Sequence, residues 1–198
     1  MLISHYTDDL LEAGCDEAGR GCLAGPVYAA AVILPKTFHD EKLNDSKKLS
    51  VTLRLRLREE ILNKAVAWSV AWATPQEIDQ LNILQASFLA MHRAVQSLVP
   101  KPEFLLIDGN RFKKYEDIPY VCMVKGDSKY MSIAAASVLA KVFRDEYMHQ
   151  LHGTYPAYHW DCNKGYPTLS HIKAIRSMGL TPEHRLTFHC KEQLKLTL

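Results

Sequence analysis

The sequence predicts an α/β fold: a mixed central sheet flanked by helices and followed by a small helical C-terminal extension. Short apolar runs bounded by glycine or proline indicate strands, and longer segments with apolar residues at helical spacing indicate helices. Acidic residues stand at the ends of three predicted strands, and strand ends are where open α/β sheets assemble their sites. These observations together predict a domain with a site at one edge of the sheet.

Length and composition predict one domain over residues 1–198, with about 153–198 as the extension. The formal net charge is only +2, so binding of nucleic acid would rest on a local basic face. The five cysteines lack Cys-x-x-Cys spacing, which favours reduced thiols over a disulfide framework or a structural zinc site. Neither a signal peptide nor an apolar run long enough to span a membrane is apparent, so we expect a cytoplasmic protein.

The first two strands are predicted on either side of a glycine-rich turn. Leu10, Leu11 and Ala13 are apolar, as is the run over 27–34, and Asp16 and Glu17 stand where the first strand ends. Unpaired carboxylates beside apolar strands are costly, and a divalent cation would offset that cost. Neighbouring strand residues face opposite sides, so both acids reach one ion only if the strand bends.

The middle of the chain alternates helices and strands. Ser50 can cap a helix over 51–64, whose arginines are expected to face solvent. The strand over 66–73 alternates large apolar residues with small ones, and its two tryptophans are assigned to the core. A capping box at 74–77 starts a helical pattern that runs to about residue 98, with a break near Asn82.

Two further strands, over 103–107 and 120–124, each lead into an acid next to a glycine, Asp108 and Asp127. A single acid at a strand end is most often a turn or cap residue, but acids at three strand ends favour a site. A long helix over 132–149 follows, then a short helix over 169–178 and another that begins at Thr181.

Four strings in this chain resemble motifs of the type 2 ribonucleases H, in particular the bacterial ribonuclease HII family. They are Asp-Glu-Ala-Gly-Arg-Gly from residue 16, Asp-Ser-Lys-Lys-Leu from 45, Lys-Gly-Asp-Ser-Lys from 125 and the Gly-Tyr pair at 165–166. The resemblance extends over residues 13–188 and implies a ribonuclease H-like catalytic domain. The related ribonuclease HIII type has an added N-terminal domain, for which we expect no room before residue 16.

The resemblance also implies roles for individual residues. Four acids are expected to be catalytic and to bind divalent metal, Mg²⁺ or Mn²⁺: Asp16, Glu17, Asp108 and Asp127. Substrate binding is expected from Gly19, Arg20, Gly21, Ser46, Lys47, Lys48 and Tyr166. The glycine turn would contact a phosphate or a ribose 2′-OH, and the tyrosine would stack on a deoxyribose at an RNA–DNA junction. For the loop lysines, an ordinary solvated loop with a helix cap is the alternative.

The implied reaction is hydrolysis of the RNA strand of RNA–DNA hybrids and cleavage 5′ of single ribonucleotides in duplex DNA, leaving 3′-OH and 5′-phosphate ends. The partners would be hybrid and ribonucleotide-containing DNA, bound by a monomer, in DNA replication and ribonucleotide excision repair. Two alternatives stay open: a metal-dependent nuclease of other specificity, such as an exonuclease, and a non-catalytic nucleic-acid-binding module. Cleavage of a closed circular substrate, and binding without metal-dependent cleavage, would distinguish them.

Overall fold

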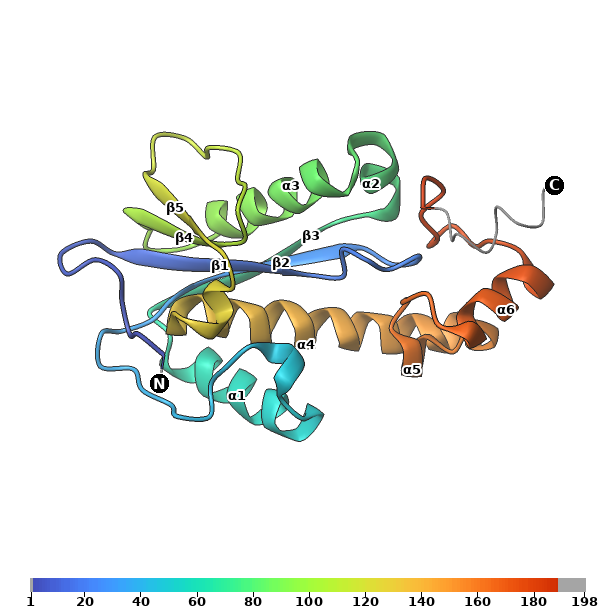
Figure 1. Cartoon of the computed structure of the whole chain (residues 1–198), viewed down its shortest axis with the longest axis horizontal. Helices are drawn as coiled ribbons and strands as arrows, with labels where there is room; N and C mark the ends of the chain where they lie inside the picture. The colour runs from blue at the N-terminus through green and yellow to red at the C-terminus, as the bar shows by residue number, and fades with distance from the viewer. Residues whose placement is uncertain (1, 189–198) are drawn as a thin grey trace.

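A computed structural model of the chain describes residues 2–188, and the mixed sheet flanked by helices is confirmed (Figure 1). The predicted extension therefore lies within the described residues only up to residue 188, and His189 and Cys190 lie outside them. Across residues 2–188, the helices are all too short or too polar to cross a membrane.

The sheet has five strands in the order β3-β2-β1-β4-β5. The strands are β1 (Glu12–Ala18), β2 (Val27–Ile33), β3 (Ala67–Ala73), β4 (Phe104–Asp108) and β5 (Tyr120–Met123). Strands β1, β2 and β3 pair antiparallel, whereas β1, β4 and β5 run parallel. The central strand β1 thus carries its acids between an antiparallel and a parallel neighbour.

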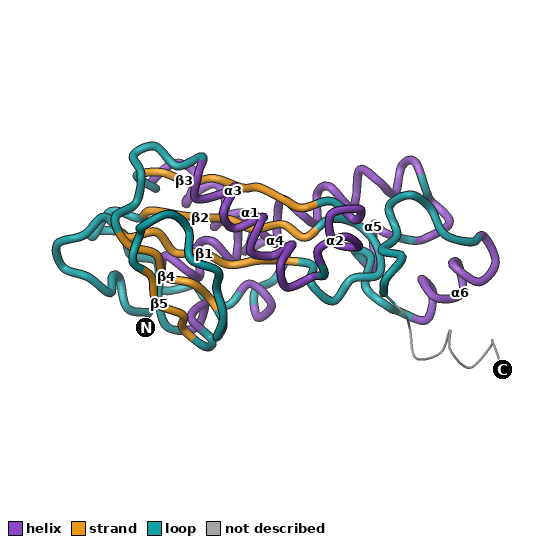
Figure 2. Tube along the Cα trace, turned by 90° about the horizontal axis from the view of Figure 1, so that it is seen from above, coloured by secondary structure: helices purple, strands orange, loops and turns teal. Residues whose placement is uncertain are grey.

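Helices cover both faces of the sheet (Figures 1 and 2). On one face α4 (Met131–Thr154) packs along β1 and β2, with α1 (Val51–Lys64) outside it. On the other face α3 (Ile83–Gln96) covers β2 and β3, and α2 (Pro75–Leu81) precedes it. Close approach of α4 depends on Gly14, where an added Cβ would lie 2.2 Å from the backbone of Ser132.

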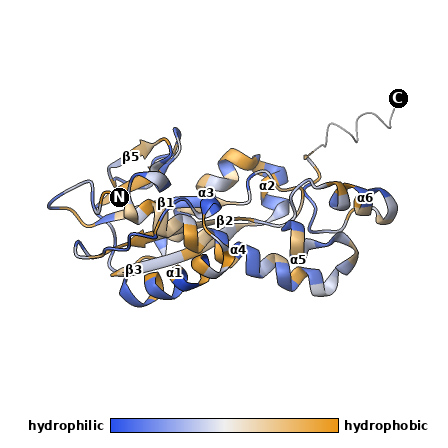
Figure 3. Cartoon of the chain, turned by 60° about the horizontal axis from the view of Figure 1, so that its bottom comes forward, coloured by the Kyte–Doolittle hydropathy of each residue, from blue (hydrophilic) through white to orange (hydrophobic). Residues whose placement is uncertain are grey.

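Local sequence accounts for the helix boundaries. The Ser50 hydroxyl accepts a hydrogen bond from the backbone N–H of Leu53 at the start of α1, and Thr74 forms the predicted capping box with Glu77. Asn82 has a φ of 69° and separates α2 from α3, as predicted. Hydrophilic residues dominate the outer side of α1 (Figure 3).

The assignment of Trp68 and Trp72 to the core is wrong, because their side chains are 39% and 49% exposed. Strand β3 lies at the sheet edge, and its small residues face α3, where only small side chains leave room for the helix. The tryptophans face the opposite side of this edge. There Trp68 lies against Phe143, and Trp72 stacks on Tyr28 with ring centroids 5.5 Å apart.

The C-terminal part forms a separate apolar cluster at one end of α4 (Figure 1). Helix α4 runs to Thr154, five residues beyond its predicted end, because its last turns pack against α5 (Trp160–Asn163). Helix α6 (Leu169–Met178) has its predicted bounds. The helix predicted from Thr181 is wrong. Residues 181–188 form turns, because the backbone around His184 pairs with Ala24 instead.

Candidate active site

The four predicted acids come from three elements next to one another in the fold. Asp16 and Glu17 lie near the end of β1, Asp108 is the last residue of β4, and Asp127 lies in the short 3-10 helix η2 (Gly126–Ser128). Parallel pairing of Cys15 with Ile107 places the two following residues, Asp16 and Asp108, side by side at this edge. Repulsion from Asp108 raises the pKa of each of the other three carboxyl groups.

Asp16 is 5% exposed and faces α4. Burial is the main cause that raises its pKa well above the ordinary value, and repulsion from Glu17 and Asp108 adds to it. Hydrogen bonds from Ser137 and from the Glu17 backbone N–H, 2.7 Å from Oδ1, act in the opposite direction. Taken together, these effects leave the charged carboxylate disfavoured without a cation.

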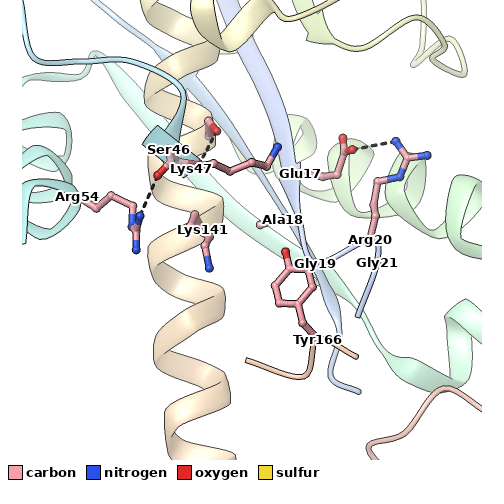
Figure 4. A pocket seen from close by; sticks show the side chains of 11 residues that line it. Glu17, Ala18, Gly19, Arg20, Gly21, Ser46, Lys47, Arg54, Lys141 and Tyr166 are labelled. Atoms are coloured by element: carbon pink, nitrogen blue, oxygen red, sulfur yellow. Dashed lines mark hydrogen bonds and ion pairs between the residues drawn. The ribbon is translucent and has the colours of Figure 1, made fainter. Parts of the chain in front are cut away.

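Glu17 faces away from Asp16, because β1 stays regularly paired with β2 through Ala18 and does not bend between the two acids. Burial raises the pKa of Glu17, while the Arg20 guanidinium, 3.0 Å from Oε1, lowers it (Figure 4). The bend that the sequence predicted at the acids is therefore absent, and the chain turns only after Ala18.

Asp108 and Asp127 meet through η2. Asp108 Oδ1 accepts a hydrogen bond from the backbone N–H of Gly126 at 2.7 Å, which ties the end of β4 to η2. Burial and repulsion from Asp108 and Asp45 raise the pKa of Asp127. Asp45 is a fifth acid at this edge that the sequence reasoning missed, because it occurs in a loop of mixed charge.

The donor set fits a hard divalent cation, since all four side chains offer carboxylate oxygens and repel one another in its absence. Within residues 2–188, however, no three acid, histidine or cysteine side chains are already drawn together as a coordination shell. Glu17 is held by Arg20, and Asp108 is held by the Gly126 backbone. Binding a cation would thus compete with contacts that the carboxylates make here.

A cavity of about 570 Å³ is lined by Glu17, the only one of the four acids to border it, by the turn at 19–21 and by Tyr166 (Figure 4). Lys47 reaches into it from one side and Arg20 borders it on the other, with Lys141 below. Its rim therefore combines backbone groups, an aromatic ring and basic side chains. That combination suits a nucleic-acid backbone.

A model of the ribonuclease HII family matches residues 13–192 of this chain. The chain belongs to this family. Two ribonucleases HII show the level of similarity: that of Phocaeicola vulgatus is 62% identical over 96% of this chain and 94% of its own length. That of Parabacteroides distasonis is 60% identical over 99% of both chains. The chain is accordingly a type 2 ribonuclease H.

Solved structures of this family share the fold. A ribonuclease H2 from Pyrococcus horikoshii superposes with a TM-score of 0.78 at 24% identity, covering 94% of this chain and 97% of its own. The ribonuclease HII in a PCNA complex from Archaeoglobus fulgidus superposes with a TM-score of 0.75 at 27% identity, covering 92% of this chain and 96% of its own. The family fold thus includes the part of the chain that carries Tyr166.

The loop residues predicted to bind substrate differ in exposure. Ser46 is 3% exposed, and its hydroxyl lies 2.9 Å from that of Ser137, which also contacts Asp16. Lys47 is exposed and lines the cavity. Lys48 donates to Ser128 Oγ at 3.2 Å, so its side chain lies against η2. Substrate binding by all three stays a prediction, and the geometry favours Lys47 for a direct contact.

Sequence reasoning missed the two buried arginines that support this site, Arg144 and Arg185, which are 1% and 2% exposed. Both lie behind the turn at 19–21 and bond to backbone carbonyl groups. No local signal marks a buried arginine, since the pattern around each also fits an exposed one. Arg54 was expected to face solvent but is half-buried, donating to the carbonyl oxygens of Ser46 and Leu49.

Proposed function

We propose that this type 2 ribonuclease H is an endonuclease that hydrolyses the RNA strand of RNA–DNA hybrids and cuts 5′ of single ribonucleotides in duplex DNA. The observation that carries the proposal is that β1, β4 and η2 place four acidic residues at one edge of the sheet, next to the turn at 19–21 that lines the cavity. Family membership supports the hybrid substrate. We further propose that one copy of the domain suffices, acting in the cytoplasm in replication and ribonucleotide excision repair.

We propose that Asp16, Glu17, Asp108 and Asp127 would hold two divalent cations. When bound, such cations supply an activated water and stabilise the leaving oxygen, which yields 3′-OH and 5′-phosphate ends. If Glu17 bound a cation, its 3.0 Å ion pair with Arg20 would be weakened, and the Arg20 guanidinium would be available to a phosphate. A ribonuclease HIII with the same fold, at 19% identity and a TM-score of 0.68, was solved in complex with Mn²⁺, and it is longer, since the match covers 69% of it.

The proposed cleavage position is tested on a DNA duplex with one embedded ribonucleotide, with the product ends mapped to the nucleotide. We expect one cut on the 5′ side of the ribonucleotide, no cut in the all-DNA duplex, and loss of cleavage in a chelator with recovery in Mg²⁺ or Mn²⁺. Cleavage that starts only from strand ends would indicate an exonuclease, and binding without cleavage would indicate a non-catalytic module.

Tyr166 is proposed to recognise the deoxyribose side of the junction. Its ring borders the cavity and is 36% exposed, so a sugar can pack against it. Stacking on an aromatic ring is worth about 1–3 kcal/mol, so Tyr166→Ala should cut a single embedded ribonucleotide about 5- to 160-fold more slowly. The rate on a long hybrid should fall less, and Tyr166→Phe should resemble the parent. An unchanged ratio of the two rates would remove Tyr166 from junction recognition.

Lys47 is proposed to contact a backbone phosphate. Because phosphate contacts release counterions, affinity for the duplex should fall steeply as salt rises. Lys47→Gln should reduce the slope of log affinity against log salt by about one unit. Lys36→Gln, remote from the cavity lining, is the control and should leave the slope unchanged. Equal slopes in parent and Lys47→Gln would exclude this contact.

A further inference from the structure

The turn at residues 19–21 is held from behind by Arg185. This guanidinium donates from Nη2 to the Gly19 carbonyl oxygen at 2.7 Å, from Nη1 to that of Arg20 at 2.9 Å and from Nε to that of Gly25 at 2.9 Å. The side chain is 2% exposed. Besides these three carbonyl groups, the Phe188 ring lies 5.0 Å from the guanidinium carbon, and Asp79 stabilises the positive charge at longer range.

Arg144, on α4, packs against the same turn from the protein side. It donates to the carbonyl oxygens of Pro26, Lys164 and Ala24 at 2.9–3.1 Å, and its guanidinium carbon lies 5.9 Å from the centre of the Tyr166 ring. An added Cβ at Gly19 would lie 1.9 Å from Arg144 Nε, so the turn packs directly on this second cation. The side of the turn that faces the protein therefore consists of carbonyl groups and two positive charges.

The opposite side of the turn follows from peptide geometry. In a planar trans peptide the C=O and N–H groups point in opposite directions. Because Arg185 draws the Gly19 and Arg20 carbonyls inward, the N–H groups of Arg20 and Gly21 point outward. Neither N–H has a hydrogen-bond acceptor among residues 2–188, and the space around an added Cβ at Gly21 is open for 4 Å. Both residues line the cavity described above.

We propose that Arg185 is a positioning residue for substrate recognition: by binding the Gly19 and Arg20 carbonyl groups, it presents two backbone N–H donors to an oxygen atom of the substrate. This inference rests on the proposed function and deepens it. The turn acts as a donor surface, because the Gly19 and Arg20 carbonyl groups already accept hydrogen bonds from Arg185 on the side that faces the protein. The ribose 2′-oxygen and a phosphate oxygen are the two acceptors that a nucleic acid offers there.

Lysine at position 185 keeps the charge but cannot donate to three carbonyls in the fixed fork of a guanidinium. We therefore measure binding of an all-DNA duplex and of the same duplex with one ribonucleotide, in a chelator so that neither is cut. Ile175→Val serves as the control, because Ile175 is buried in the same C-terminal cluster without contacting the turn. Thermal unfolding establishes that each variant is folded.

For the parent we expect tighter binding of the ribonucleotide duplex. Arg185→Lys should reduce the ratio of the two affinities at least about fivefold, the effect of one ordinary hydrogen bond, while Ile175→Val keeps the parent ratio. If both affinities fall at least about fivefold together, the turn binds a phosphate oxygen and the role of Arg185 stands. A folded Arg185→Lys with both affinities within about twofold of the parent overturns the inference.

Backbone hydrogen exchange in the parent keeps the inference testable if Arg185→Lys does not fold. The Arg20 and Gly21 amides should exchange freely in the unbound protein and be protected when the ribonucleotide duplex binds. Absence of that protection when the ribonucleotide duplex binds overturns the role given to Arg185. The proposed function is judged separately, by the cleavage map in Mg²⁺.

Discussion

The strand-end acids and the region behind the turn at 19–21 both bury charged groups, but they compensate that charge to different degrees. In the first, burial and mutual repulsion raise the pKa of Asp16, Glu17 and Asp127. In the second, Arg144 and Arg185 each donate to three carbonyl oxygens. One region is thus left electrostatically incomplete, and the other is completed by the protein itself.

A buried histidine pair extends the completed region. The Thr181 N–H donates to His184 Nδ1 at 2.9 Å, and His184 Nε2 lies 3.2 Å from His171 Nε2. Trp160 Nε1 donates to the same His171 nitrogen, and His171 Nδ1 contacts the Tyr166 carbonyl oxygen at 2.9 Å. Because His171 Nε2 and His184 Nδ1 each accept a hydrogen bond, neither nitrogen carries a proton, and both rings are neutral. On this comparison we propose that the uncompensated charge of the acids serves cation binding and that the compensated charge of the arginines serves positioning.

The largest effect expected is a loss of turnover when Asp108, the acid that repels each of the other three, is neutralised. Asp108→Asn keeps an oxygen for the Gly126 N–H and should lower kcat about 10³-fold. The free energy of unfolding without metal should stay the same or rise, because the change removes repulsion. Asp117→Asn, which removes an exposed acid paired with Lys114, is the control for both measurements. A destabilised Asp108→Asn would contradict the view that this cluster is electrostatically incomplete.

In the C-terminal cluster, by contrast, a neutral substitution should act on stability. Arg144→Met keeps most of the volume but leaves the carbonyls of Ala24, Pro26 and Lys164 without their donor, and should lower the free energy of unfolding by about 3 kcal/mol. Arg56→Met is the control, since Arg56 is exposed and its ion pairs contribute less than about 1 kcal/mol. Urea unfolding of both variants checks this. Similar losses would remove the distinction between the buried and the exposed arginine.

The effect expected to be smallest near neutral pH is a pH dependence of stability. Burial, aided by His171, lowers the pKa of His184 to about 4 from an ordinary 6.5. Between these two pH values the unfolded chain therefore binds more protons than the folded chain. The contribution of neutral His184 to the free energy of unfolding is complete above pH 6.5. It is lost as the pH falls towards 4, by up to about 1.4 kcal/mol per pH unit. We measure the free energy of unfolding of the parent and of His184→Gln as a function of pH. The difference between the two isolates the contribution of His184 from that of the acids, which titrate in the same pH range. A pH-independent difference would show that His184 does not contribute.

Most of the fold could be predicted from the sequence, because its elements depend on local patterns. Helix α1 has its predicted bounds, since Ser50 caps it and apolar spacing continues to Ile61. The break at Asn82 follows from one residue, and apolar runs that stop near a glycine mark the ends of β4 and β5. The exposure of Trp68 could not be predicted, because alternation defines two faces of a strand but not which one a helix covers.

The site divides in the same way. By itself, the sequence determined the four candidate acids, the glycine turn and the aromatic residue opposite, because each stands in a recognisable string. Only the tertiary structure decided which arginines are buried and which backbone groups face the cavity. Arg185 binds the Arg20 carbonyl from 165 positions away along the chain. Such a contact leaves no trace in local spacing, since hydrogen bonds to backbone carbonyls can form at any residue that the fold brings within reach.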